Sequence, residues 1–261
     1  MSWDLLWGKP SERTPIDVHE LELPLADLAK GLAGARLAVV SDLHYGRFAG
    51  DAYARRVVRE VMACRPDLIC LLGDLINGQA SECARCAAVL ADLRAPLGVF
   101  GVLGNHEHYG GWRTALDVYC EIGVQVMLNE HQVIRRNGAA MVLAGIDDHR
   151  RGRPDIAAAL AGADPALPAV VLSHNPDPAH GIPADVRVDV MLSGHTHGGQ
   201  VVLFDHPILT RTRHRQYFRG WAQGPRCRVY TNRGVGVVGL PLRLNARPEI
   251  PIFRLVRKAQ T

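Results

Sequence analysis

The chain has 261 residues, 48% of them hydrophobic, and a formal net charge of +4. A chain of this length can bury a large core without disulfide bonds, and its six cysteines show no dense disulfide spacing. No apolar run approaches the roughly 18 residues of a membrane-spanning helix. We therefore do not expect a small disulfide-stabilised protein or an integral membrane protein.

Charge is unevenly distributed along the chain. Residues 201–261 carry 12 Lys and Arg against 2 Asp and Glu, a net +10, which leaves −6 for residues 1–200. The segment 211–219 mixes arginines with aromatic residues. This pattern suits the rim of an anionic substrate site, and a solvated basic face is the alternative.

The first ten residues lack a basic region followed by a long apolar run, and they lack a twin-arginine pair. We therefore expect a cytoplasmic protein that could contact the inner membrane peripherally. For the apolar start around Trp3 and Trp7 we prefer a packed N-terminal arm to an interfacial anchor.

Short apolar runs alternate with helical stretches along most of the chain. Strands are expected at residues 17–25 (an edge strand), 36–41, 67–72, 97–103, 124–128, 132–135, 139–144, 169–173, 186–193, 200–204, 226–231 and 250–256. Helices are expected at residues 51–64, 80–93, 114–121 and 154–161, the last with Pro154 in its first turn. Continuous apolar strands indicate sheets buried on both faces and an α/β layer architecture. Without a repeat or linker, a single domain over residues 1–261 is the simplest division, with an N-terminal arm and edge strand at 1–35 and the core of the domain at 36–256.

Polar residues of the metal-ligand type follow five of these strands. They are Asp42 and His44, Asp74, Asn105 and His106, His174, and His195 and His197. Each of them taken alone could cap a helix or form a turn. Because ligands bind beyond the carboxyl ends of strands in α/β sheets, five such ends in one chain point to a shared site.

The stretch Ser193–Gln200 carries His195 and His197 one residue apart, at the end of a buried strand. Two such imidazoles can point at one place only if the backbone there is extended and uncrowded, and neighbouring glycines supply the room. Neutral imidazole is the commonest ligand for transition metals, so we expect a metal site here. A pair of loop histidines is the alternative.

Mixed oxygen and nitrogen ligands without thiolate favour Mn, Fe or Zn over Ca, Mg or an iron–sulfur cluster. Two ions about 3.5–4 Å apart need ligands for each ion and a carboxylate that bridges them. One ion could be held by Asp42, His44 and His197, and the other by Asn105, His174 and His195, with Asp74 as the bridge.

Five blocks of residues resemble, in their order along the chain, the motifs of the calcineurin-like metallophosphoesterase superfamily. They are Asp42-Leu43-His44, Gly73-Asp74-Leu75-Ile76-Asn77, Gly104-Asn105-His106-Glu107, His174 and Gly194-His195-Thr196-His197, and the extension Gly198-Gly199-Gln200 resembles a bacterial phosphodiesterase branch. The resemblance implies a four-layer α/β/β/α sandwich with two facing mixed sheets and a centre of two divalent transition-metal ions, with manganese favoured. It implies the same ligand set, places His106 beside the scissile phosphate, and implies phosphoester hydrolysis.

We therefore expect a metal-dependent phosphodiesterase in which a hydroxide that bridges the ions attacks phosphorus in line. The expected catalytic residues are His106, which assists the leaving group, with Asp74 and Asn105. The expected substrate is a phosphate-containing small molecule or lipid, and we expect no nucleic acid partner. One alternative is a pyrophosphatase that acts on a nucleotide-linked lipid precursor of the UDP-2,3-diacylglucosamine type. Another is a non-catalytic scaffold that binds membrane or nucleic acid through the basic C-terminal segment.

Several other residues have weaker functional interpretations. His108 and Tyr109 could line the pocket, and we expect Asp147 and Asp148 to cap a turn. The residues 234–239 match a dinucleotide-binding glycine pattern, but Pro241 excludes the helix that such a site needs.

Overall fold

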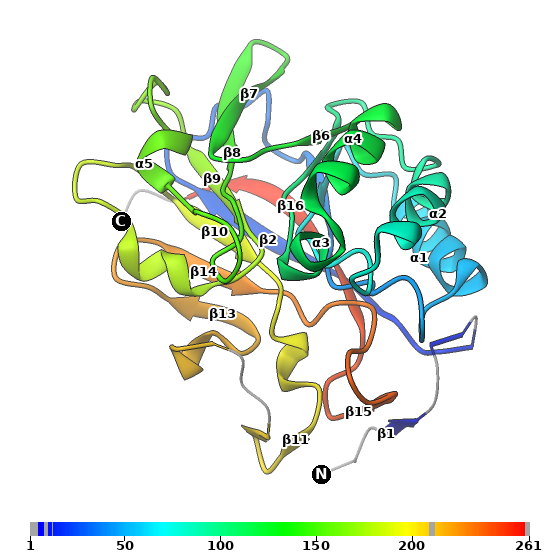
Figure 1. Cartoon of the computed structure of the whole chain (residues 1–261). Helices are drawn as coiled ribbons and strands as arrows, with labels where there is room; N and C mark the ends of the chain where they lie inside the picture. Colours follow the sequence, from blue (N-terminus) through cyan, green and yellow to red (C-terminus); the bar gives the residue numbers. More distant parts are fainter. Residues whose placement is uncertain (1–4, 8–9, 12, 209–211, 259–261) are drawn as a thin grey trace.

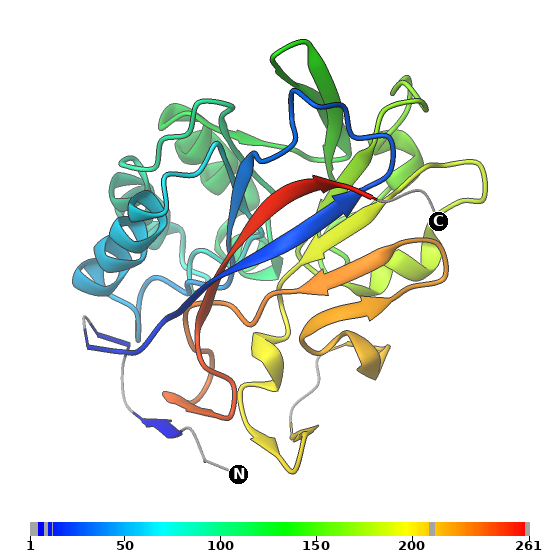
Figure 2. The same cartoon turned by 180° about the vertical axis from the view of Figure 1, so that it is seen from behind.

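The computed structural model describes the chain except residues 1–4, 8–9, 12, 209–211 and 259–261, and it describes only the backbone of residues 5–7. Two six-stranded mixed sheets form the centre of the molecule, and helices lie outside them (Figures 1 and 2).

The first sheet has the order β2-β16-β3-β4-β5-β6. These strands are β2 (Asp17–Leu25), β16 (Glu249–Arg257), β3 (Arg36–Val40), β4 (Leu68–Leu71), β5 (Val99–Gly101) and β6 (Val124–Val126). β3 to β6 are parallel, so their carboxyl ends lie along one edge of the sheet. β16 runs antiparallel to β3 and parallel to β2, which is the edge strand that the sequence predicts.

The second sheet has the order β13-β14-β10-β9-β8-β7. Its strands are β13 (Gly220–Gln223), β14 (Arg228–Thr231), β10 (Val190–Ser193), β9 (Ala169–Ser173), β8 (Ala139–Gly145) and β7 (Glu130–Arg136). The four central strands are parallel, and β13 and β7 pair with them antiparallel at the two edges.

Alternating side chains of each strand fill two different layers of the core. In β3, Leu37 and Val39 pack in the layer between the sheets, together with Val170 and Leu172 of the other sheet. The intervening residues of β3 face the outer helices α1 (Asp51–Ala63), α2 (Ala80–Leu90) and α4 (Trp112–Glu121). A third cluster covers the outer face of the second sheet with α5 (Ile156–Ala159) and the 3-10 helices η1 (Asp177–Gly181) and η3 (Arg215–Tyr217). The predicted four-layer α/β/β/α sandwich is confirmed.

Two small two-stranded ribbons lie outside the main sheets. β1 (Leu5–Trp7) pairs with β15 (Leu242–Leu244), and β11 (Val202–Leu203) pairs with β12 (His206–Pro207). Both views place β1, β11 and β15 at the same end of the molecule, near the N-terminus (Figures 1 and 2).

The boundaries of several predicted elements were wrong. The strands expected at 97–103 and 186–193 are shorter, and the short helix α3 (Asn105–Gly110) and strand β13 were not predicted. Pro154 does not start α5, because Asp155 is the N-cap and its carboxylate accepts a hydrogen bond from the Ala158 N–H at 2.9 Å. Within the described residues, none of the helices combines the length and apolar character needed to cross a membrane.

Candidate metal centre

The predicted ligands lie beyond the carboxyl ends of strands from both sheets. Asp42 and His44 follow β3, Asp74 follows β4, Asn105 begins α3 after β5, His174 follows β9, His195 follows β10, and His197 begins the 3-10 helix η2 (His197–Gly199). All seven are buried. Because the two sheets face each other, ligands that are up to 155 positions apart in the chain (42 to 197) converge at one edge of the sandwich.

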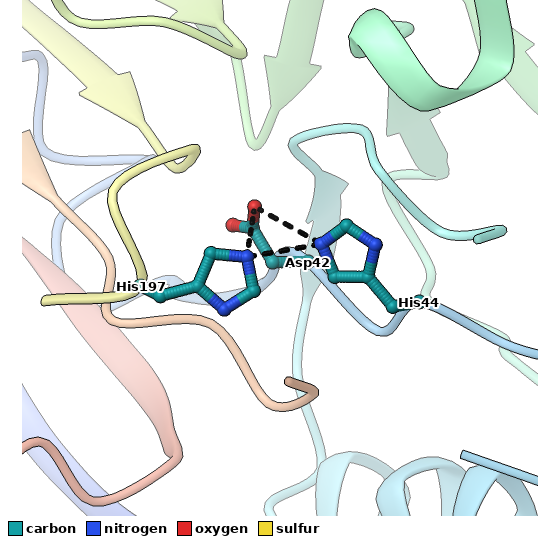
Figure 3. Close-up of side chains that lie close together, drawn as sticks. All are labelled: Asp42, His44 and His197. Carbon is teal, nitrogen blue, oxygen red and sulfur yellow. Dashed lines mark hydrogen bonds and ion pairs between the residues drawn. The ribbon is translucent and has the colours of Figure 1, made fainter. Parts of the chain in front are cut away.

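The first group consists of Asp42, His44 and His197, whose ligand atoms all lie within 4.8 Å of one another. Figure 3 shows the three side chains pointing toward one another. The two Nε2 atoms of the histidines are 3.0 Å apart, and His197 Nε2 lies 3.4 Å from Asp42 Oδ1. These three residues could hold one metal ion.

The second group consists of Asp74, His174 and His195, with the same limit of 4.8 Å between ligand atoms. His174 Nε2 lies 3.2 Å from Asp74 Oδ2 and 3.1 Å from His195 Nδ1. The Oδ1 atom of Asn105 is buried and has no hydrogen-bond partner in the described part of the chain. A buried amide oxygen without a donor is costly, and a cation would satisfy it.

Asp74 belongs to the second group and also approaches the first. Its Oδ2 atom is 3.8 Å from His44 Nε2 in the first group and 3.2 Å from His174 Nε2 in the second. The donor set suits a pair of metal ions: imidazole nitrogens on each side, the Asp42 carboxylate on one side, the Asn105 amide oxygen on the other, and the Asp74 carboxylate near both.

Strong electrostatic coupling accompanies this arrangement. Burial raises the pKa of Asp42 to about 6. Burial also disfavours the charged form of Asp74, but the imidazoles of His174, His106 and His44 outweigh it and hold the pKa of Asp74 well below its usual range. The same contact overcomes the burial of His174 and raises its pKa to about 10. Without metal, His174 therefore keeps a proton that a metal ion would have to displace.

The backbone of the Gly-His-Thr-His loop is not extended, so that expectation was wrong. The φ angles of His195 and His197 are +71° and +53°, and Asp42, His44 and Asp74 also have positive values of 53°, 48° and 50°. The sharp left-handed turns send His195 toward His174 and His197 toward His44, which is why two nearby histidines serve different groups. Such conformations cost about 1–3 kcal/mol each and are typical of functional sites.

Two glycines are required by the close approach of the backbone segments. A Cβ atom on Gly234, whose φ is +68°, would lie 2.6 Å from the Cβ atom of Asp42. A Cβ atom on Gly194 would overlap the hydroxyl of Ser41. Gly194 is one of the glycines that the sequence suggested for room beside the histidines, whereas the need for Gly234 beside Asp42 was not predicted.

His106 lies beside the metal groups and is partly accessible. Its Nδ1 atom is 2.8 Å from the carbonyl oxygen of Asn77, which can only accept, so Nδ1 carries a proton. Its Nε2 atom faces Asp74 Oδ2 at 3.9 Å, and its side chain is 13% exposed. The backbone N–H of His106 donates to Asp74 Oδ1 at 2.8 Å, so this helix start and the central carboxylate are held together.

Glu107 is buried and ends the Gly-Asn-His-Glu block, for which the sequence predicts no role at this position. Its carboxylate accepts hydrogen bonds from four backbone N–H groups: those of Asp74 (2.8 Å), Leu75 (2.6 Å), Ile76 (3.3 Å) and Gly104 (2.8 Å). It thereby joins the loop after β4 to the start of α3. Its place in the Gly-Asn-His-Glu block was the only indication of its importance in the sequence. Most of its hydrogen-bond donors are backbone N–H groups of the loop after β4, which no sequence pattern links to Glu107.

Arg243 is a second buried residue for which the sequence motifs predict no role. It is fully buried and donates to the carbonyl oxygens of Gly236 (2.8 Å), Arg233 (2.8 Å) and Ala246 (2.9 Å). It also donates to the carbonyl oxygen of His197 at 3.2 Å, and its Nη2 lies 3.2 Å from His197 Nδ1. Burial lowers the pKa of Arg243 to about 10, so the guanidinium stays charged at neutral pH. It fixes the position of His197.

The weaker candidates lie next to the metal groups but outside them. His108 Nε2 is 2.9 Å from Asp147 Oδ1, and Tyr109 packs edge to face on His106 with a centroid distance of 5.4 Å. Asp148 accepts hydrogen bonds from the backbone N–H groups of Arg150 and Arg151, in agreement with a turn-capping role. The glycine-rich residues 234–239 form a loop without a helix.

Comparison with known proteins agrees with this geometry. A family model described as calcineurin-like phosphoesterase matches residues 35–199. The uncharacterized metallophosphoesterase YkuE of Bacillus subtilis is 34% identical over 248 residues, which are 92% of this chain and 85% of that protein. An uncharacterized metallophosphoesterase of Aquifex aeolicus is 32% identical over 251 residues and 92% of each chain. A transmembrane protein with a metallophosphoesterase domain from Danio rerio is 29% identical over 94% of this chain, which spans only 58% of that relative.

Solved structures share the fold at low identity. The NAD nucleotidase of Haemophilus influenzae superimposes with a TM-score of 0.53 and 15% identity over 77% of this chain and 45% of that one. A 5'-nucleotidase precursor from Thermus thermophilus gives a TM-score of 0.51 and 17% identity over 77% of this chain and 49% of that one. With its fold, its converging His and Asp side chains and its match to the family model over more than half its length, the chain belongs to the calcineurin-like phosphoesterase family.

Proposed function

We propose that this protein is a phosphodiesterase that depends on two divalent transition-metal ions. The observation that carries the proposal is the position of Asp74, whose Oδ2 atom lies 3.2–3.9 Å from the imidazoles of both three-residue groups and of His106. A carboxylate shared in this way suits two ions that act together on one phosphoryl group.

In this proposal each ion has its own ligands. Asp42, His44 and His197 would hold one ion, Asn105, His174 and His195 the other, and Asp74 would bridge them. Mixed nitrogen and oxygen donors favour Mn, Fe or Zn, and we favour manganese. When bound, such ions lower the pKa of water toward neutrality and stabilise negative charge on the phosphoryl oxygens.

His106 assists the leaving group. In the imidazolium form Nδ1 donates to the carbonyl oxygen of Asn77, so Nε2 carries the proton that would be delivered to the departing alkoxide, and this leaves a neutral imidazole protonated on Nδ1. The 13% exposure of this side chain allows a substrate to reach it. General acid catalysis of this kind contributes a factor of about 10²–10⁴ to the rate.

The experiment is metal analysis of the purified protein combined with hydrolysis of bis-p-nitrophenyl phosphate and p-nitrophenyl phosphate. We expect faster turnover of the diester and two bound ions. His106→Gln should keep both ions and lose about 10²-fold or more in kcat, whereas Asp74→Asn should lose metal and activity together. His131→Gln is the matched control, because His131 contacts the carbonyl oxygen of Ala159, outside the site.

Two outcomes would contradict the proposal. Normal turnover by His106→Gln would remove its assigned role. No turnover of either ester with Mn, Fe or Zn would favour a non-catalytic scaffold.

A pyrophosphatase acting on a nucleotide-linked lipid precursor is the second candidate. The backbone N–H groups of Arg213 and His214 donate to the carboxylate of Asp177 at 2.8 and 3.1 Å. These bonds attach the basic segment to the loop that begins at His174, which suits an anionic substrate with two phosphates. Faster hydrolysis of a UDP-diacylglucosamine than of bis-p-nitrophenyl phosphate would favour this candidate.

A further inference from the structure

Exposed apolar side chains gather at one end of the molecule. Among the side chains that the structure describes, the large hydrophobic residues that are exposed are Phe204 (74%), Ile208 (57%), Leu240 (61%) and Tyr109 (49%). Tyr109 lies beside His106, but the other three lie on turns next to β11, β12 and β15. Figures 1 and 2 show these ribbons at the same end, away from both main sheets. We call Phe204, Ile208 and Leu240 the apolar tip.

The apolar tip consists of two loops, one with Phe204 and Ile208 around β11 and β12 and one with Leu240 before β15, and hydrogen bonds join the two. The side chain of Gln200, just before β11, donates to the carbonyl oxygens of Val238 and Leu240 at 3.0 and 3.1 Å. The Leu244 N–H donates to the Gln200 carbonyl oxygen at 2.9 Å, and Asn245 Nδ2 donates to the Val202 carbonyl oxygen at 2.9 Å. The three exposed side chains therefore belong to one connected unit.

The apolar tip is also connected to the metal centre. Gln200 directly follows η2, which begins with His197, and β15 on the other loop carries Arg243, which donates to the His197 carbonyl oxygen. Both loops thus reach the same proposed ligand. A surface bound at the apolar tip would be held at a defined place relative to the metal centre.

A cationic segment is linked to the apolar tip at its C-terminal end. The described segment Thr212–Arg219 contains three arginines and no acidic residue, and Arg213 and Arg215 are exposed. Arg219 joins this segment to the tip, because it donates to the Asn245 carbonyl oxygen at 2.8 Å and lies 3.3 Å from Asp205. Apolar side chains on turns with cations beside them are typical of segments that enter the interface of an anionic membrane.

We propose that the apolar tip and the segment Thr212–Arg219 dock on a membrane surface that contains anionic lipids. Phe204, Ile208 and Leu240 insert among the head groups, and Arg213 and Arg215 contact lipid phosphates. This contact requires neither bound metal nor turnover, so it stands or falls separately from the proposed catalysis.

The test is sedimentation of the full chain with vesicles of phosphatidylcholine alone or with added phosphatidylglycerol, in the metal-free and the metal-loaded protein. We expect binding to the anionic vesicles in both forms, weakening as salt is raised. The triple variant F204S/I208S/L240S should bind at least about tenfold more weakly, since three apolar side chains would lose their burial. The conservative variant F204W/I208L/L240I should retain binding.

The basic segment is tested by R213S/R215S, with R226S/R257S as the control, since Arg226 and Arg257 are exposed elsewhere. We expect about a tenfold loss for the first pair and little change for the second. All variants should keep the melting temperature, and the variants at Phe204, Ile208 and Leu240 should also keep the hydrolysis of bis-p-nitrophenyl phosphate in solution. No binding to anionic vesicles, equal binding by the triple serine variant, or equally strong binding to neutral vesicles would overturn the proposal. A tip-dependent dimer in the absence of vesicles would also overturn it and would assign the tip to a second copy of the chain.

Discussion

Replacement of Arg243 by methionine should destabilise the protein and weaken one of the two metal sites. The methionine keeps an apolar stem of similar length but removes the guanidinium, so the carbonyl oxygens of Gly236, Arg233 and Ala246 lose donors at 2.8–2.9 Å. Hydrogen bonds from a charged donor contribute about 1.5–3 kcal/mol each, so the gross loss is about 4–9 kcal/mol.

Part of this loss is offset, because burying the charged guanidinium costs several kcal/mol of desolvation and the variant no longer has this cost. We therefore expect the free energy of unfolding to fall by about 3 kcal/mol. At about 2–4 °C per kcal/mol for a chain of this size, the melting temperature should fall by about 6–12 °C.

The effect on metal should be unequal. His197 would lose the donor to its carbonyl oxygen and the contact at its Nδ1, so the ion held with Asp42 and His44 should bind about 10–100-fold more weakly. The ion at His174 and His195 should change much less. Urea unfolding and calorimetric metal titration measure the two effects.

Two further variants complete the experiment. Arg257→Met, at an exposed position, should change stability by less than about 0.5 kcal/mol. Arg243→Lys keeps the charge but cannot match the planar array of donors, so it should show a smaller loss of the same kind. If Arg243→Met left both metal affinities and the unfolding free energy unchanged, the assigned role of Arg243 would be wrong.

The remaining predictions concern Glu107, the contact between His108 and Asp147, and the proton on His174. Glu107→Ala should lower the free energy of unfolding by at least about 3 kcal/mol, because four N–H groups lose their acceptor. A urea titration in which the variant's free energy of unfolding lies within about 1 kcal/mol of that of the unmodified protein would contradict this. The hydrogen bond to Asp147 raises the pKa of His108 in the folded protein. The contact therefore stabilises the fold fully at pH values below the pKa that His108 has in the unfolded chain, and this stabilisation is lost as the pH rises through the pKa of His108 in the folded protein. Asp147→Asn should therefore destabilise by about 1 kcal/mol near pH 6 and less near pH 9, and a pH-independent difference in unfolding free energy would argue against the ion pair. Because Asp74 raises the pKa of His174 to about 10, although burial opposes this, metal binding should release a proton and strengthen by up to about tenfold per pH unit between pH 6 and 9, as a chelator competition would measure.

Local patterns identified the proposed ligands, which the structure brings close together, but not the residues that support them. Each ligand follows a strand whose apolar run is visible in the sequence, and parallel strands bring their carboxyl ends to one edge. Glu107 and Arg243 act on backbone groups of distant loops. No sequence pattern identifies a carbonyl oxygen or an N–H group as a partner, so these contacts required the three-dimensional arrangement.

The backbone conformation at the site was also not predictable from the sequence. The spacing of His195 and His197 suggested an extended segment, yet both residues have positive φ, as does Asp42. Propensity disfavours these angles for residues other than glycine, and the energy that maintains them comes from packing against neighbouring loops.

Sequence patterns identified the α/β class, most of the strands and helices, and the set of polar residues at the strand ends, because hydrophobic periodicity and turn residues act over a few positions. Which distant segments meet depends on the three-dimensional fold, since the pairing of β2 with β16 joins residues 17–25 to 249–257 and the facing of the two sheets brings Asp42 to His197. Those contacts depend on burying a shared apolar layer between the sheets, which is a property of the whole chain rather than of any one stretch of it.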